Sequence, residues 1–214
     1  MNTDDLIAQL SAAAAPVRRL APPMTRALLW LAAIAILSGV PILLRSNLAV
    51  FAERASDPRM ALELFATLAT GVAGVIAAFH LSLPDRPRAW ALLPAPFVLL
   101  WIVVTGIGCL EFLPEQARRG WDLGQSHHCF VFLLSVGLPL AGLLLLTLRR
   151  ASPLQPRLVA SVGALGVAGL AAFILQFFHP FDVTVMDLGT HVVALALLIG
   201  VFSLSGRLTL SARG

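Results

Sequence analysis

The chain has 214 residues, of which 58% are hydrophobic and only 12% are charged, and its mean hydropathy is +0.89. A soluble globular domain is typically about 45–50% apolar and about 25% charged. The charged residues are too few to cover the surface of a soluble single-core enzyme, and the apolar residues are too many for a disordered chain. The composition is typical of a polytopic membrane protein, for which we predict an all-α fold.

Six apolar stretches are long enough to cross a bilayer, which takes about 20 residues of helix. They cover residues 27–44, 60–81, 89–110, 130–148, 158–178 and 188–204. We therefore predict a bundle of six transmembrane helices over residues 27–206, between a tail over residues 1–26 and a tail over residues 207–214. The first tail lacks the pattern of a cleavable signal peptide, so we expect it to be retained.

All fifteen basic residues are arginines, and their distribution predicts the orientation of the bundle. Ten lie on the side that holds both tails: Arg18, Arg19, Arg26, Arg86, Arg88, Arg149, Arg150, Arg157, Arg207 and Arg213. Five lie on the other side: Arg45, Arg54, Arg59, Arg118 and Arg119. Because cytoplasmic loops are enriched in basic residues, we expect both termini to be cytoplasmic. The net charge of +4 then reflects orientation and contact with the lipid bilayer, and we expect no direct binding to nucleic acid.

Five glycines in the second and fifth stretches recur at spacings of three residues. They are Gly71, Gly74, Gly163, Gly166 and Gly169. Small residues let the backbones of membrane helices approach closely. We therefore expect these glycines to lie where helices pack against one another.

The first tail predicts a short amphipathic helix that Pro16 ends. Asp4 and Asp5 fall in its first turn, where the helix dipole favours negative charge. Its apolar face consists of Leu6, Ile7 and Leu10. A helix of about three turns is marginal alone in water, so it needs a surface to dock on.

Three environments are possible for this tail. A helix lying on the membrane fits poorly, because such helices carry basic polar faces and this one begins with two aspartates. Disorder is the second alternative. A cytoplasmic protein that takes the helix into a groove fits better, and the segment Val17, Arg18, Arg19, Leu20 would then connect that helix to the first span.

The scarce polar residues gather on the side opposite the tails. This group contains Cys109, His127, His128, Cys129, His179, Asp182 and His191. The cysteines flank one loop between adjacent antiparallel helices, where they could form a disulfide in an oxidising compartment. Together with the histidines they could instead hold a soft or borderline transition-metal ion such as Cu(I), Zn(II) or Cd(II).

A plainer interpretation of these residues remains open. A buried cysteine often behaves as a small apolar residue, and a histidine at the end of a span often only contacts the interface. Glu63 lies four residues after Arg59, a spacing that favours a structural ion pair.

Several motifs, in their order and spacing, resemble the NrsF family of bacterial membrane anti-sigma factors over essentially the whole chain. The motifs are residues 3–7 and 16–20, Asp57-Pro58-Arg59, residues 88–94, Gly108-Cys109, Cys129-Phe130, residues 179–182 and His191. The pair His127 and His128, directly before Cys129, departs from the family pattern.

The resemblance implies a regulator in the inner membrane rather than an enzyme. Such proteins hold an extracytoplasmic-function sigma factor through their cytoplasmic part and release it under stress. The resemblance places sensing of heavy metals or oxidants at Cys109 and Cys129, with no obligatory cofactor. The contact with the sigma factor is expected at Asp4, Asp5, Leu6, Ile7, Leu10, Val17, Arg18, Arg19 and Leu20.

Two other functions use the same residues. A membrane thiol–disulfide oxidoreductase would need a resolving cysteine pair, and the chain has no Cys-x-x-Cys motif. A small metal transporter would need ionisable residues near the middle of the membrane, where this sequence has almost none.

Overall fold

The computed structural model describes residues 2–13, 20–119, 124–151, 153–178 and 185–210, and within them it contains helices and no strand. The all-α prediction is confirmed. In chain order the helices are α1 (Thr3–Ala13), α2 (Pro23–Arg45), α3 (Leu48–Ala55), α4 (Pro58–Leu81), the 3₁₀ helix η1 (Arg88–Leu92), α5 (Ala95–Arg119), α6 (Gly124–Leu148), the 3₁₀ helix η2 (Arg149–Ala151), α7 (Pro156–Leu175) and α8 (Val185–Leu210).

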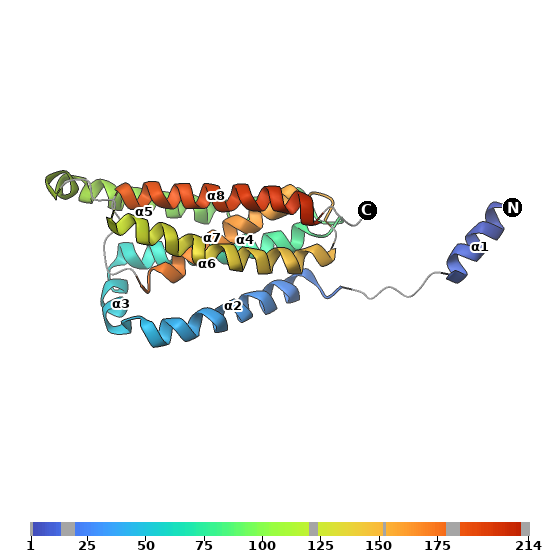
Figure 1. Cartoon of the computed structure of the whole chain (residues 1–214), viewed down its shortest axis with the longest axis horizontal. Helices are drawn as coiled ribbons and strands as arrows, with labels where there is room; N and C mark the ends of the chain where they lie inside the picture. The colour runs from blue at the N-terminus through green and yellow to red at the C-terminus, as the bar shows by residue number, and fades with distance from the viewer. Residues whose placement is uncertain (1, 14–19, 120–123, 152, 179–184, 211–214) are drawn as a thin grey trace.

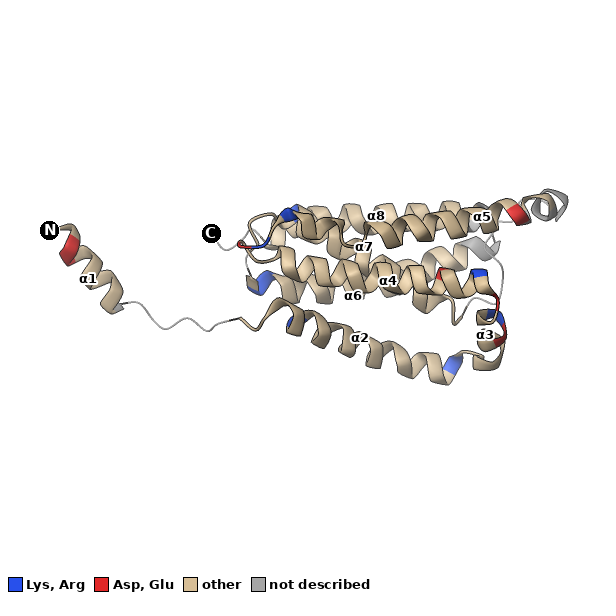
Figure 2. Cartoon of the chain, turned by 180° about the vertical axis from the view of Figure 1, so that it is seen from behind, with Lys and Arg blue, Asp and Glu red and all other residues tan. Residues whose placement is uncertain are grey.

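Within the described residues, six helical segments are long and apolar enough to cross a membrane, so the chain is a multi-pass membrane protein by length and composition. The segments are Pro23–Arg45, Pro58–Leu81, Arg88–Glu111, His127–Ala151, Pro156–Leu175 and Leu188–Leu210. Each contains most or all of one predicted span. Figure 2 shows the charged residues toward the two ends of the bundle, with uncharged helix between them.

The bundle has two ends, which we call the terminal end and the distal end. At the terminal end α2 begins and α8 finishes, and at the distal end α3 connects α2 to α4 (Figure 1). The cysteines and histidines of α5 and α6, which we predicted on the side opposite the tails, belong to the distal end.

Side-chain caps and prolines set the helix boundaries at the distal end. Asp57 accepts a hydrogen bond from the backbone N–H of Met60 (3.2 Å), and Pro58 is the first residue of α4, a position that needs no N–H donor. Asn47 accepts one from the N–H of Val50 (3.2 Å) and starts α3. Hydropathy did not predict α3, because this short helix carries two charged residues and buries none of its own.

The core of the bundle is the pair α4 and α7. About two thirds or more of their spans are buried (67% and 78%), against 17% for α2 and for α8. Glycine makes this contact possible. A Cβ atom built on Gly74 would lie 2.5 Å from Cα of Gly166, and one on Gly169 would lie 2.8 Å from the backbone N of Gly71. The expected close approach of these glycines is confirmed.

The other helices surround this pair. α5 and α2 pack against α4, while α6 packs against α7 and α8. At the terminal end the Arg26 side chain donates to the carbonyl of Thr147 (2.9 Å) and lies over the ring of Phe79 (5.1 Å), so it joins α2 to α6 and α4. Near it, the rings of His80 and Trp90 stack with centroids 3.8 Å apart.

Candidate functional site

The predicted partner-binding helix in the N-terminal tail is present as α1. Asp4 and Asp5 lie in its first turn, and residues 2–12 are all exposed. The apolar face is exposed as well, with 59% of Ile7 and 63% of Leu10 accessible. Leu20 is also exposed, whereas Val17, Arg18 and Arg19 lie outside the described residues. In the part of the chain that the structure describes, nothing covers the apolar face of α1.

The two cysteines are buried near the distal end. Cys109 on α5 is 3% exposed and Cys129 on α6 is 1% exposed. Cys129 belongs to an apolar cluster that also contains Leu133, Ala171 and Leu175. Among the described residues, α5 packs mainly against α4 and α8, and α6 packs mainly against α8 and α7, while Trp101 of α5 also packs against the cluster that holds Cys129.

The predicted histidine partners of the cysteines lie in different environments. His127 and His128 are exposed, with ring centroids 5.6 Å apart, and His191 on α8 is half-buried. His179 and Asp182 fall outside the described residues. Among the residues that are described, no group of three His, Cys, Asp or Glu side chains could hold a metal ion. The metal site stays a prediction.

A polar cluster close to Cys109 was not predicted from the sequence. The Glu63 carboxylate, on α4, accepts hydrogen bonds from the Thr105 hydroxyl (3.2 Å) and from the Gln176 amide (3.4 Å). Thr105 on α5 and Gln176 at the end of α7 are both buried. These bonds give Glu63 partners on two other helices, which its spacing from Arg59 did not suggest.

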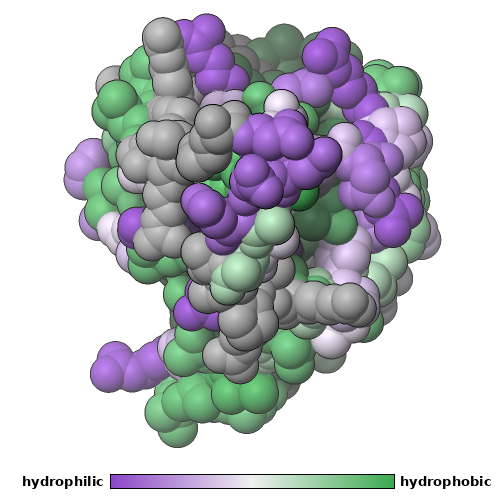
Figure 3. Space-filling view, turned by 90° about the vertical axis from the view of Figure 1, so that its right-hand side faces the viewer, coloured by the Kyte–Doolittle hydropathy of each residue, from purple (hydrophilic) through white to green (hydrophobic). Residues whose placement is uncertain are grey.

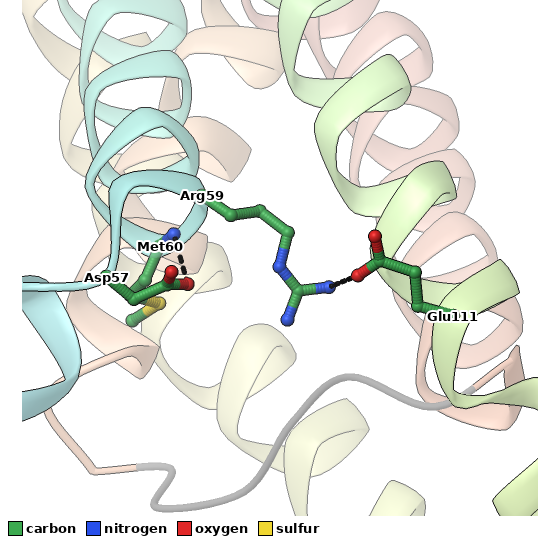
Figure 4. Close-up of polar contacts among 4 residues, drawn as sticks. All are labelled: Asp57, Arg59, Met60 and Glu111. Atoms are coloured by element: carbon green, nitrogen blue, oxygen red, sulfur yellow. Dashed lines mark hydrogen bonds and ion pairs between the residues drawn. The ribbon is translucent and has the colours of Figure 1, made fainter.

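An ion pair extends this cluster toward the distal surface. Arg59 reaches from α4 to α5 and donates to the carboxylate of Glu111 (3.2 Å), as Figure 4 shows beside the Asp57 cap of α4. Gly108 leaves room for this side chain, because a Cβ atom there would overlap the Arg59 guanidinium. We call Arg59, Glu63, Thr105, Glu111 and Gln176 the distal polar cluster.

The distal polar cluster brackets Cys109 along α5. Thr105 lies one turn before this cysteine, and Glu111 follows it by two residues. Both are bonded to α4, so the turn that carries Cys109 is held on either side. Beside it is a cavity of about 120 Å³, lined by Arg54, Asp57, Arg59, Met60, Glu63, Thr105, Gly108 and Gln176.

The glutamate could have been noticed in the sequence, because an ionisable residue one turn inside a span usually has a specific partner. Its partners could not be found there. Thr105 is 42 positions away and Gln176 is 113 positions away, and only the packing of α4, α5 and α7 brings them together.

Comparison with known proteins places the chain in a family. The family model NrsF, described as negative regulator of sigma F, matches residues 10–211 and so includes all six spans and the distal polar cluster. No curated protein and no solved structure gives a match. Because the matched region covers nearly the whole chain, the protein belongs to the NrsF family, whose name implies a negative regulator of a sigma factor.

Proposed function

We propose that this protein is an inner-membrane anti-sigma factor that holds an extracytoplasmic-function sigma factor on α1 and releases it when a heavy metal or an oxidant reacts at Cys109 and Cys129. The observation that carries the proposal is the exposed apolar face of α1, in a chain whose family name implies a sigma-factor partner. In this proposal both termini are cytoplasmic, in line with the ten arginines on their side of the bundle.

The proposed contact is a helix in a groove of the sigma factor. Leu6, Ile7 and Leu10 share one face of α1, and burying an aliphatic side chain contributes about 1.5–3 kcal/mol. Part of this is offset, because a helix of eleven residues is marginal alone and becomes ordered on binding. Asp4 and Asp5 favour a basic rim on the partner, which would direct the helix into one orientation.

The proposed sensor follows from the burial of the two thiols. Cys109 and Cys129 are almost fully enclosed, so a bound metal ion or an added oxygen atom would change the packing around the thiol that holds it. Reaction at either thiol would therefore favour a different helix arrangement. Because a ligand shifts an equilibrium toward the state that it binds better, the inducer would raise the population of this second helix arrangement.

A chain of direct contacts could carry this change to the tail. The turn with Cys109 is bonded to α4 through Thr105 and Glu111. α4 in turn packs against α2, and α2 follows directly after the tail. In this proposal the bonds between α5 and α4 pass the change to α4, and its contact with α2 passes the change on toward the tail.

The test is co-purification of the sigma factor with the full chain from membranes. Leu10→Asp places a charge in the proposed contact and should reduce the bound sigma factor by at least tenfold, which corresponds to about 1.4 kcal/mol. Ala8→Asp is the matched control, because Ala8 is exposed on the opposite face of α1 and receives the same charge. Equal loss of sigma factor in both variants, or in neither, would exclude this face of α1 as the contact.

A further inference from the structure

One side of the bundle is incomplete along the distal half of α2. The buried residues of this helix, Pro23, Ala27, Trp30 and Ile34, all lie in its terminal half. From Ala35 to Arg45 every residue is described and none is buried. Figure 1 shows α2 diverging from the other helices toward α3, and in Figure 3 the apolar surface below the main body lies where α2 runs.

The space beside the distal half of α2 is real at atomic scale. Ser38, Gly39 and Ile42 are half-buried and share one side of the helix, yet no described atom lies within 4 Å of a Cβ atom built on Gly39. The Ser38 hydroxyl is already bonded within α2, to the carbonyl of Ile34 (2.8 Å). Apart from Ser38, this side of α2 is apolar, so in a membrane the space beside it suits a hydrocarbon chain.

Farther along α2, where the helix ends at Arg45, is a cavity of about 230 Å³. Arg45 from the end of α2 and Arg54 from α3 both line it. Its aromatic wall is the stacked pair Phe51 and Phe177, whose ring centroids are 4.1 Å apart. Two arginines above an apolar groove match the two parts of a phospholipid, a phosphate and its acyl chains.

We propose that this site binds an anionic phospholipid, with the phosphate at Arg45 and Arg54 and an acyl chain between the distal half of α2 and the bundle. The charge of the cavity selects the lipid class. Among the described residues that line it, two carry a guanidinium group and none carries a carboxylate, so a headgroup with an ammonium ion is disfavoured and one with a neutral alcohol is accepted. Phosphatidylglycerol has this chemistry.

The bound lipid would complete the packing of α2, the span that follows directly after the tail. Without it, the distal half of α2 contacts little of its own chain. The site is independent of the sigma factor, since it uses no residue of α1.

The experiment is native mass spectrometry of the full chain, purified in a neutral detergent and incubated with phosphatidylglycerol or phosphatidylethanolamine of the same acyl chains. Phosphatidylglycerol should be retained in preference. The double variant Arg45→Gln/Arg54→Gln should retain about tenfold less of it, because the lost charge-assisted hydrogen bonds are of that size. Arg88→Gln, an exposed arginine at the terminal end, is the matched control and should bind as the wild type does.

A second variant tests the groove without changing charge. Gly39→Leu fills the space beside α2 and should fold, since no described atom blocks its Cβ, while reducing retention of both lipids. Equal retention of the two lipids by the wild type would overturn the proposal. Unchanged retention of phosphatidylglycerol in both the double variant and Gly39→Leu would overturn it as well.

Discussion

At the scale of single residues, Glu63 is a side chain that connects three helices. It is the acceptor for donors on two other helices, Thr105 and Gln176, which are buried. Hydrogen bonds between membrane helices contribute about 0.6–2 kcal/mol each, a modest value because the unfolded chain in the membrane also finds partners for its polar groups. Glu63 thus stabilises one arrangement of α4, α5 and α7.

Replacing this carboxylate should loosen the distal end. Glu63→Leu leaves both donors without this acceptor and should lower the free energy of unfolding by about 1–3 kcal/mol, measured as thermal stability in detergent. Glu53→Leu is the control, because Glu53 is exposed on α3. A melting temperature equal to that of the control would show that the two hydrogen bonds contribute nothing.

A second prediction at this scale concerns the role of the two cysteines in the stress response. Serine is close in size to cysteine but is a poor ligand for soft metals and does not form disulfides, so Cys109→Ser and Cys129→Ser should blunt the response to metal or oxidant. The complex with the sigma factor should persist in unstressed cells. A sigma-dependent reporter gene measures both states, and a variant that still responds normally removes its cysteine from the mechanism.

At the scale of elements, the contact between α4 and α7 is made of backbone rather than side chains. Gly166→Leu would drive a side chain into the backbone of Gly74 and Val75, and overpacking of this kind costs about 1–3 kcal/mol or more. We therefore expect poor accumulation in the membrane and a lower melting temperature. Gly200→Leu on α8 is the control, since no described atom lies within 4 Å of a Cβ there. Similar stability of the two variants would contradict the close contact.

The sequence predicted these elements to different extents, for physical reasons. The six spans and the contact between glycines were predicted, because hydropathy and small-residue spacing are local properties of the chain. The helix α3 was missed, since its start depends on the Asn47 cap and not on hydropathy. The distal polar cluster was missed because Glu63 and its partners meet only after α4, α5 and α7 have packed.

At the scale of the whole molecule, the predicted orientation can be measured directly. In a chain whose own cysteines are replaced by serine, Arg88→Cys and His128→Cys place one exposed thiol at each end of the bundle. A membrane-impermeant maleimide should label His128→Cys in intact spheroplasts and Arg88→Cys only after lysis, because the proposed orientation places the arginine-rich end in the cytoplasm. The reverse pattern would invert the proposed topology and place α1 outside the cell.

The anchoring of α2 limits how far the tail can reach. Arg26 joins the start of α2 to Thr147 and Phe79, so the point where the tail leaves the bundle is fixed. Nine residues separate the end of α1 at Ala13 from Pro23, and fully extended they span about 30 Å. A protein bound to α1 is therefore held close to the bilayer. Its distance from the membrane surface is limited to roughly 30 Å, about the diameter of a small protein domain. In the proposed function, confinement to this thin layer would keep the sigma factor away from most of the chromosome, in addition to any surface that α1 covers.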